Sequence, residues 1–513
     1  MSSELLQVLG RSTTRREFLA VTGGFLALGV IPGCRGDART RFRAYPFALG
    51  VASGDPAPDG VVLWTRLLDD APLTAPVSVR WELARDEAFR QIERQGDLMA
   101  VPELAHSVHV EVDGLEPDRV YHYRFVAGDD VSPPGRTRTA PLPGAAIDDL
   151  RFAFCSCQNW QQGLYTAFRH MAAEDARFVV HLGDYIYEGG VSRQSVRPHD
   201  GPELLTLEQY RSRYALYKSD ADLQAAHAAF PFIVTWDDHE VDNNYAGGIA
   251  EDGMDPAAFL LRRAAAYQAF YEHQPLRRAA MPRGPDMQLY RRLQYGNLID
   301  LHVLDTRQYR TDQACGDGMR VDCAEAASAS ATLMGSAQER WLHDGLAASR
   351  ARWNVLGTQV PIAPSARRRG DAMAQDMDKW SGYAAERDRL IAFLREQHVS
   401  NPVSIVGDVH VNWLAQLKMR WDDPASPDVG VEFVGTSISS GGDGRDAADS
   451  PMLRDNPHVR FYNGQRGYVR CRVTPDRWTA DYRIVPWVTR PDAPIETRAS
   501  FVVENGRPVA EPA

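Results

Sequence analysis

The sequence is poor in cysteine, has no excess of positive charge and contains no long hydrophobic run. Six cysteines among 513 residues are too few for a scaffold built on disulfides. The formal net charge is −11, from 57 Lys and Arg against 68 Asp and Glu. This acidic balance argues against sequence-independent nucleic-acid binding, in which basic side chains neutralise phosphates. No apolar run reaches the roughly 20 residues that span a bilayer, which excludes a transmembrane protein.

The remaining composition is that of a globular protein. The hydrophobic fraction is 44% and the charged fraction is 24%, which excludes disorder as the dominant state. At roughly 150 residues per domain, the length predicts two to four domains with ample buried core.

The first residues have the pattern of an export signal. Arg15-Arg16 is followed by a short, weakly hydrophobic stretch from Val21 to Ile31, which resembles a twin-arginine (Tat) signal peptide over residues 1–33. The run that ends in Cys34 also resembles a lipoprotein cleavage box, and the pattern leaves lipidation of Cys34 open. Residues 34–43 are expected to form a tether. We expect export by the Tat machinery to the periplasm or beyond, with membrane attachment only through Cys34.

Residues 44–142 have the pattern of an all-β sandwich. Val77, Val79, Trp81 and Leu83 alternate with Ser, Arg and Glu, which predicts a strand buried on one face. The turn before Tyr121 resembles the tyrosine corner of fibronectin type III domains. We therefore expect a fibronectin-III- or Ig-like sandwich with a structural or interaction role.

Residues 150–490 have the pattern of an α/β domain, followed by a tail at 491–513. Short apolar strands alternate with helical segments, which predicts a sheet covered by helices on both faces. A helix is expected over Ser336–Ser349, with Ser336 and Glu339 as a capping box. A hairpin in which apolar and polar residues alternate is expected to close one sheet. The predicted strands and hairpin are Arg151–Cys157, Phe178–Leu182, Pro231–Thr235, Trp353–Gly357, Val403–Val406, Gly467–Val473 and Trp478–Ile484.

Each of the five single strands ends in polar residues of metal-ligand type. In open α/β sheets, ligands bind beyond the carboxyl ends of the strands. One such ending is weak evidence, but five that converge on one sheet edge indicate a binding site. The endings are Cys155-Ser156-Cys157, Gly183–Tyr187, Trp236–Glu240, Thr358-Gln359 and Gly407–His410.

The spacing of these residues resembles known metal-dependent enzymes. Gly-Asp-x-x-Tyr, Asp-His-Glu where Asn-His-Glu is usual, and Gly-x-x-His are similar to motifs of the binuclear metallophosphatases. The fuller set resembles the alkaline phosphatase D (PhoD) family over residues 45 to about 487, and adds Ser156-Cys157-Gln158 and Asp305–Arg310. The resemblance implies a four-layer metallophosphatase domain that pairs Fe³⁺ with Ca²⁺ and hydrolyses phosphate monoesters and diesters.

The resemblance assigns four ligands to the iron. Asp184 is expected to bridge both metals, and Tyr187 to bind iron as a phenolate. Cys157 is expected to bind as a thiolate and His410 through its imidazole. The alternatives are a turn aspartate, a core tyrosine and, for Cys157, a small buried hydrophobe. Cys155 is expected to be such a hydrophobe.

The second metal is expected to be calcium, as one ion or two, with other divalent metals left open. The matching positions are Asp238, Gln359 and Asp408, all of which offer oxygen where the wider superfamily supplies nitrogen or amide ligands. Oxygen donors suit calcium, magnesium or manganese. A structural role is the alternative for Gln359.

The catalytic expectations follow from the same motifs. His239 is expected to contact phosphate and protonate the leaving oxygen, with Asp238 beside it, and Glu240 to orient His239. Arg307 and Arg310 are expected to clamp phosphate, with solvated surface charges as the alternative. The remaining candidates are Asn243 and Asn244, and a loop disulfide between Cys315 and Cys323.

The sequence therefore predicts an exported phosphoester hydrolase acting on a small molecule or a lipid headgroup. Two alternatives stay open: a phospholipase D-like phosphodiesterase on the same scaffold, and an inactive surface-binding protein. The sequence does not specify the preferred ester or the oligomeric state.

Overall fold

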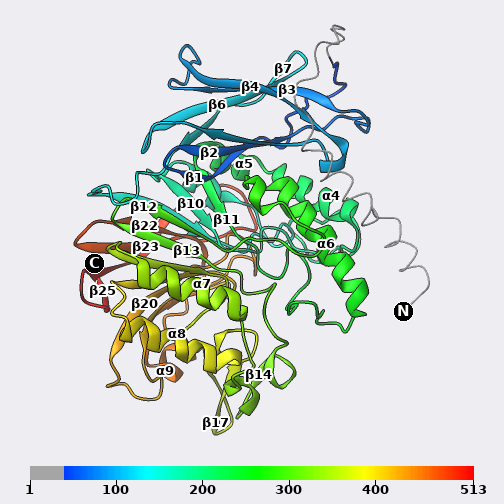
Figure 1. The fold of residues 1–513 in the computed structure, drawn as a ribbon. Helices are drawn as coiled ribbons and strands as arrows, with labels where there is room; N and C mark the ends of the chain where they lie inside the picture. Colours follow the sequence, from blue (N-terminus) through cyan, green and yellow to red (C-terminus); the bar gives the residue numbers. More distant parts are fainter. Residues whose placement is uncertain (1–39) are drawn as a thin grey trace.

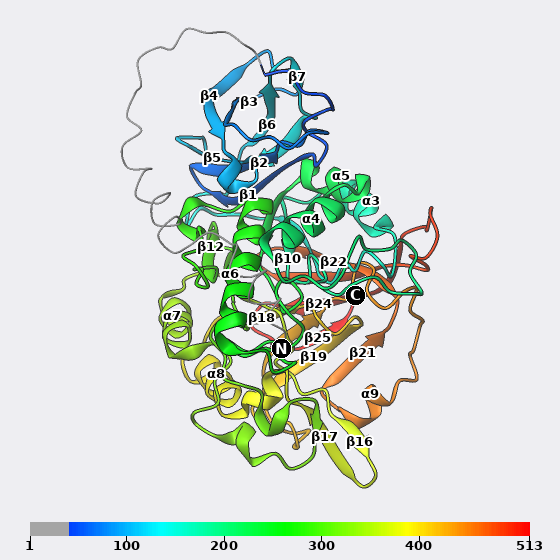
Figure 2. The same cartoon turned by 90° about the vertical axis from the view of Figure 1, so that its right-hand side faces the viewer.

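The computed structural model describes residues 40–513, so the expected signal peptide and Cys34 lie outside the described residues. An all-β region sits on a larger α/β body (Figures 1 and 2). The first sheet of the all-β region has the order β4-β3-β6-β7, with β8 paired to β6. Its strands are β3 (Val77–Ala84), β4 (Ile92–Ala100), β6 (Val120–Ala127), β7 (Asp130–Val131) and β8 (Gly135–Arg138). The tyrosine corner is confirmed, because the backbone N–H of Glu116 donates to the hydroxyl of Tyr121 at 3.0 Å.

The second sheet of the all-β region continues into the α/β body. It is a ten-stranded sheet with the order β25-β24-β23-β22-β9-β10-β11-β1-β2-β5. Strand β1 pairs in parallel with β11, with Ser53 opposite Pro231. The border that we predicted near residue 142 therefore divides the chain but not this sheet. The strands are β1 (Val51–Ala57), β2 (Gly60–Arg66), β5 (Ser107–Asp113), β9 (Leu150–Cys155), β10 (Phe178–His181), β11 (Pro231–Val234), β22 (Arg466–Val473), β23 (Arg477–Val485), β24 (Glu496–Glu504) and β25 (Ala510–Pro512).

A seven-stranded sheet faces the first across the core, with the order β12-β13-β15-β18-β20-β19-β21. Phe154 and Val180 from the ten-stranded sheet share one buried cluster with Val355 and Phe433 from the seven-stranded one. The two sheets are thus packed face to face through apolar side chains. The strands are β12 (Arg291–Tyr295), β13 (Ile299–Val303), β15 (Trp353–Thr358), β18 (Pro402–Val406), β19 (Asn412–Lys418), β20 (Asp428–Val434) and β21 (Val459–Asn463).

Helices cover the outer face of each sheet and complete four layers. Tyr214 and Phe270 on the first helical layer pack with Phe232 of the ten-stranded sheet. Leu342 and Leu390 on the second helical layer pack with the seven-stranded sheet. The first layer holds α3 (Thr166–Ala172), α4 (Leu207–Lys218), α5 (Ala221–Ala229) and α6 (Pro256–His273); the second holds α7 (Gly335–Ala348) and α8 (Ala384–Glu396). The predicted four-layer fold is confirmed.

The start of helix α7 differs from our prediction. Ser336 makes no capping hydrogen bond, and Glu339 instead pairs with Arg389 at 2.8 Å. The Glu386 carboxylate of helix α8 accepts the backbone N–H groups of Leu333 and Met334. A partner on a neighbouring helix therefore replaces the local capping box.

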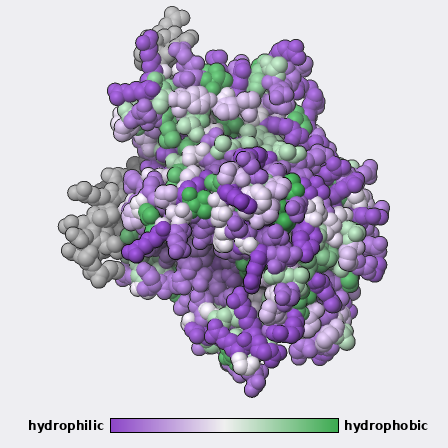
Figure 3. Space-filling model, turned by 180° about the vertical axis from the view of Figure 1, so that it is seen from behind, coloured by the Kyte–Doolittle hydropathy of each residue, from purple (hydrophilic) through white to green (hydrophobic). Residues whose placement is uncertain are grey.

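A small sheet and a short helix project from the α/β body. The sheet has the order β14-β17-β16, from β14 (Met319–Arg320), β16 (Arg367–Arg369) and β17 (Ala372–Asp376), and the helix is α9 (Pro451–Asp455). The face seen in Figure 3 is mostly hydrophilic, with hydrophobic residues in small scattered patches. Across residues 40–513, no helix has both the length and the apolar character needed to cross a membrane.

Candidate metal centre

The polar loops at the strand ends meet between the two central sheets. Strands β9, β10 and β11 belong to the ten-stranded sheet, whereas β15 and β18 belong to the seven-stranded one. Our expectation of a single sheet edge is therefore wrong. The carboxyl ends of two stacked sheets form the site together, and each sheet contributes separate ligand loops.

Five residues of these loops have left-handed backbone conformations that non-glycine residues rarely adopt. The φ values are 59° at Cys157, 56° at Asp184, 49° at Asn244, 64° at Asp408 and 57° at His410. Such conformations cost free energy and persist only where surrounding contacts enforce them, which is typical of binding and catalytic sites. The fold therefore holds these side chains in place at a cost to stability.

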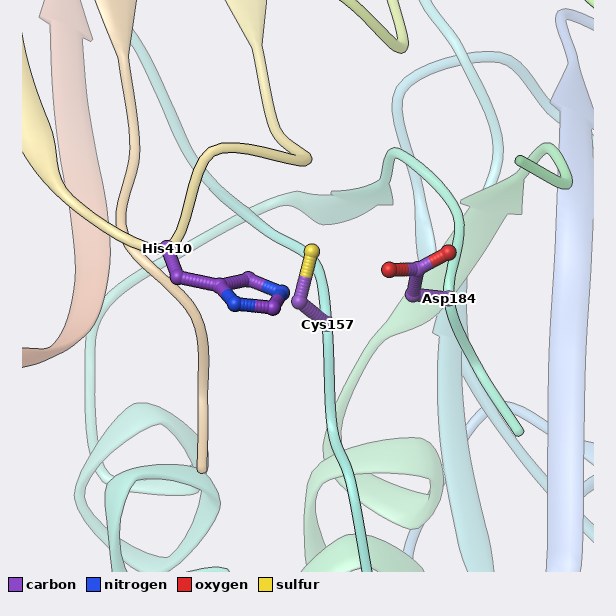
Figure 4. Close-up of side chains that lie close together, drawn as sticks. All are labelled: Cys157, Asp184 and His410. Carbon is purple, nitrogen blue, oxygen red and sulfur yellow. The ribbon is translucent and has the colours of Figure 1, made fainter. Parts of the chain in front are cut away.

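The four predicted iron ligands converge. Ligand atoms of Cys157, Asp184 and His410 all lie within 4.8 Å of one another (Figure 4). The hydroxyl of Tyr187 donates to Asp184 Oδ2 at 2.9 Å and lies 3.1 Å from His410 Nε2. Ser440 Oγ donates to the same hydroxyl at 2.7 Å. We call these four residues the thiol half of the site.

The electrostatics of the thiol half fit a bound cation. Burial raises the pKa of Asp184 well above its usual value, and burial and Asp184 do the same for Cys157 and Tyr187. Burial and Arg466 lower the pKa of His410 to about 3, so its imidazole is neutral. Asp184 Oδ1 is buried and has no hydrogen-bond partner within residues 40–513. A cation would replace the protons and fill this gap.

A second group of possible ligands, two carboxylates and one imidazole, lies beside the first. Ligand atoms of Asp184, Asp238 and His239 lie within 4.8 Å of one another. Asp238 accepts the backbone N–H groups of His239 at 2.9 Å and of Asn244 at 2.8 Å. Burial alone would raise the pKa of Asp238, but Arg307 and His239 hold this pKa below its usual range. This carboxylate is therefore charged and able to bind a cation.

Asp408, in the loop after β18, is a member of neither group and carries a protein counter-ion. The ammonium group of Lys379 lies 2.5 Å from Asp408 Oδ2 and 3.0 Å from Asp378 Oδ2. Burial raises the pKa of Asp408 to about 7, against the effect of Lys379. No sequence motif pointed to Lys379. Asp238, Asp408 and the shared Asp184 form what we call the carboxylate half of the site.

Gln359 is fully occupied by other contacts. Its Oε1 accepts the backbone N–H of Thr306 at 3.2 Å and the hydroxyl of Thr306 at 2.7 Å. Its Nε2 donates to Thr235 Oγ1 at 2.9 Å and to the Leu304 carbonyl at 2.7 Å. These bonds join strand ends of the two central sheets, so we leave Gln359 out of the proposed ligand set.

Arg307 and Arg310 do not form an exposed phosphate clamp. Both side chains are fully buried, which contradicts the alternative of solvated surface charges. Arg307 binds Asp237 at 2.5 Å and Asp378 at 2.7 Å, and Arg310 binds Asp378 at 2.6 Å. They neutralise buried carboxylates, and Arg307 also lies 3.6 Å from Asp238 Oδ2 in the site.

The partner of His239 is Glu188 and not Glu240. His239 Nδ1 lies 2.7 Å from Glu188 Oε2, and the Tyr187 ring lies 4.1 Å from the imidazole. Burial alone would lower the pKa of His239, but Glu188 and Asp238 raise it well above its usual value. Glu188 directly follows Tyr187 in the motif, and this adjacency was a signal that sequence reasoning missed.

Glu240 connects two ligand loops. Its carboxylate accepts the backbone N–H groups of Asp184 at 3.1 Å, Tyr185 at 2.6 Å and Asp237 at 2.8 Å. It therefore fixes the loop after β10 against the loop after β11. This replaces the role that we expected for it.

The two asparagines stabilise the surroundings of the site. Asn243 donates its backbone N–H to Glu188 Oε1 at 2.9 Å and its side-chain amide to Glu251 at 2.5 Å. Asn244 donates its backbone N–H to Asp238 and its side-chain amide to Asp317 at 2.8 Å.

The cysteines behave as expected. Cys315 and Cys323 form a disulfide with an S–S distance of 2.10 Å. Cys155 is buried, and burial raises the pKa of its thiol.

Comparison with known proteins gives consistent similarities. Residues 152–482 match the family model of PhoD-like phosphatase, and residues 33–141 match that of its N-terminal domain. The chain is 51% identical over 511 residues to alkaline phosphatase D of Bacillus subtilis (strain 168), covering 96% of this chain and 88% of that protein. A solved structure of PhoD superposes with a TM-score of 0.90 at 52% identity, covering 92% of this chain and 93% of the other.

Proposed function

The chain belongs to the PhoD-like phosphatase family, and we propose that it hydrolyses phosphate monoesters and diesters at a centre of ferric iron and calcium. It is a phosphoric ester hydrolase. The observation that carries the two-cation proposal is the convergence of two donor groups on one shared carboxylate, Asp184.

The thiol half suits iron. It combines a thiol, a phenol and an imidazole around Asp184, and soft sulfur and imidazole donors favour transition metals over calcium. The ion would be held by Cys157, Tyr187 and His410 together with Asp184. Asp184 would also take part in the second cation position.

The carboxylate half suits calcium. Asp184, Asp238 and Asp408 offer oxygen, which calcium accepts in flexible geometry. Bound cations would stabilise charge on the attacking and leaving oxygens of an in-line displacement at phosphorus. Lys379 would stay beside Asp408 and keep its carboxylate oriented for the cation.

His239 is placed to serve as the general acid. Because Nδ1 is engaged by Glu188, the free nitrogen Nε2 can give a proton to the leaving oxygen. Its side chain is 21% exposed, so an ester can approach it from solvent. Glu188 keeps the imidazole oriented while the proton leaves.

A substrate panel with known metal content tests this function. Purified protein should contain iron and calcium and should hydrolyse small phosphate monoesters and diesters, including lipid-headgroup diesters. Protein that binds neither metal and hydrolyses none of these esters would contradict the proposal and favour a surface-binding protein.

Export is a separate proposal, since its sequence signal lies outside residues 40–513. Folding before Tat transport would allow iron to be inserted in the cytoplasm. Replacing Arg15-Arg16 with Lys-Lys should leave active enzyme in the cytoplasm, and periplasmic enzyme in that variant would refute the signal assignment. Lipidation of Cys34 should appear as membrane-bound enzyme that Cys34→Ser releases.

A further inference from the structure

A loop closed by the disulfide lies against the carboxylate half of the site. We propose that this disulfide loop, residues 315–323, is a positioning device that holds Asp238 through Asn244 and Asp408 through Lys379. The inference rests on the proposed function, in which the carboxylate half binds calcium.

The first connection runs through Asn244. Asp317 Oδ2, inside the disulfide loop, accepts a hydrogen bond from Asn244 Nδ2 at 2.8 Å. The backbone N–H of Asn244 donates in turn to Asp238 Oδ2 at 2.8 Å. Asn244 has a φ of 49°, so its conformation needs support from such contacts. Asp317 therefore fixes the residue that orients the Asp238 carboxylate.

The second connection runs through the segment before Lys379. The carbonyl of Gly318 accepts the backbone N–H of Met377 at 3.0 Å. Strand β14, inside the loop, pairs with β17, with Met319 opposite Asp376. Lys379 follows three residues after Asp376 and lies 2.5 Å from Asp408 Oδ2. The loop therefore fixes the chain that places this counter-ion.

Gln313, just before the disulfide loop, links the two connections to each other. Gln313 Nε2 donates to the Asn244 carbonyl at 2.6 Å and to Asp378 Oδ1 at 3.0 Å. One side chain thus links the residue beside Asp238 to the residue beside Lys379. Asn244 and Asp378 are therefore expected to move together if this segment moves.

The disulfide keeps the loop in shape. Cys315, Asp317 and Asp322 have φ values of 54°, 61° and 52°, which are unfavourable for these residues. Strand β14 is only two residues long, so backbone pairing alone gives the loop little stability. Closing the ring covalently removes many open conformations.

The thiol half has different supports. Tyr187 is held by Ser440, and the carbonyl of His410 accepts a hydrogen bond from Arg466. Neither support passes through the disulfide loop. Opening the loop should therefore weaken calcium binding and leave iron binding intact.

The experiment compares two alanine variants within the loop. Asp317→Ala removes the bond to Asn244. Asp322→Ala is the matched control, because Asp322 is exposed, also has a positive φ, and has no hydrogen bond to the site in the part of the chain the structure describes. Calcium affinity is measured by titration calorimetry on the iron-loaded protein, with the visible absorbance of the iron centre recorded in parallel.

Asp317→Ala should raise the calcium Kd about 10-fold, whereas Asp322→Ala should change it less than about 2-fold. The double variant Cys315→Ser/Cys323→Ser should raise the Kd at least as much as Asp317→Ala. Adding Asp317→Ala to that double variant should have little further effect, because both changes release the same contact. The iron absorbance should stay unchanged in all of them.

Equal calcium Kd values for Asp317→Ala and Asp322→Ala would overturn the inference and leave the proposed function standing. Loss of the iron absorbance in Asp317→Ala would also overturn it, since the loop would then support the whole site. A wild-type protein that binds no calcium would overturn the calcium assignment and this inference with it.

Discussion

The thiol half and the carboxylate half differ in how far the protein itself neutralises their charge. In the thiol half, the buried Cys157 and Tyr187 lie beside the shared Asp184, whose Oδ1 has no hydrogen-bond partner among the described residues. In the carboxylate half, Asp408 is paired with Lys379, and Asp238 accepts two backbone N–H groups. The thiol half thus depends on a cation for its charge balance, whereas in the carboxylate half Lys379 already offsets the charge of Asp408. We infer that iron is held firmly and calcium exchanges readily.

The largest effect should come from the carboxylate that both halves share. Asp184→Asn removes a charge from both cation positions, and kcat/KM should fall about 10³-fold or more. Metal analysis should show reduced iron and calcium together. Retention of both metals with high activity would show that the two halves do not depend on a shared carboxylate.

Replacing His239 should impair catalysis without impairing cation binding in either half. His239→Ala should lower kcat by roughly 10²–10⁴-fold with metal content unchanged, as expected for loss of a general acid. Glu188→Gln should give a smaller loss, about 10-fold, because the imidazole remains but is less well oriented. If His239→Ala instead loses metal, His239 belongs to the carboxylate half as a ligand.

Replacing Gln359 should show whether this residue is a metal ligand or has a structural role. Gln359→Leu leaves several buried hydrogen-bonding groups unpaired and should lower the free energy of unfolding by about 2–4 kcal/mol. The calcium Kd of the folded protein should change little, because Gln359 lies outside the proposed ligand set. Thermal denaturation and calcium titration measure the two effects separately. A large rise in the Kd with unchanged stability would restore Gln359 as a ligand.

The sequence predicted the residues of both halves but not those that support the carboxylate half, for a physical reason. Cys157, Asp184 and Tyr187 stand directly after strands whose apolar pattern is local, so their positions follow from strand periodicity. Lys379 and Asp317 reach the site from irregular loops. Their partners Asp408 and Asn244 are distant in the chain, so only the folded structure brings them together.

The same limit applied to the fold. The strands follow from alternation and apolar runs, which are local patterns, whereas the four-layer order was implied by the resemblance to the PhoD family. The pairing of β1 with β11 joins segments about 180 residues apart, and the cap of α7 comes from Glu386 on another helix. Strand pairing and capping of this kind depend on tertiary packing, which can override local propensity.

The difference between the two halves is tested most directly by removing calcium while observing iron. A Tyr187 phenolate on ferric iron should give a visible charge-transfer band, which Tyr187→Phe should remove. Treating the enzyme with a calcium chelator should abolish hydrolysis and leave this band in place, and calcium, but not zinc, should restore activity. Simultaneous loss of the band and activity, or full recovery with zinc alone, would contradict the division into a firmly held iron and an exchangeable calcium.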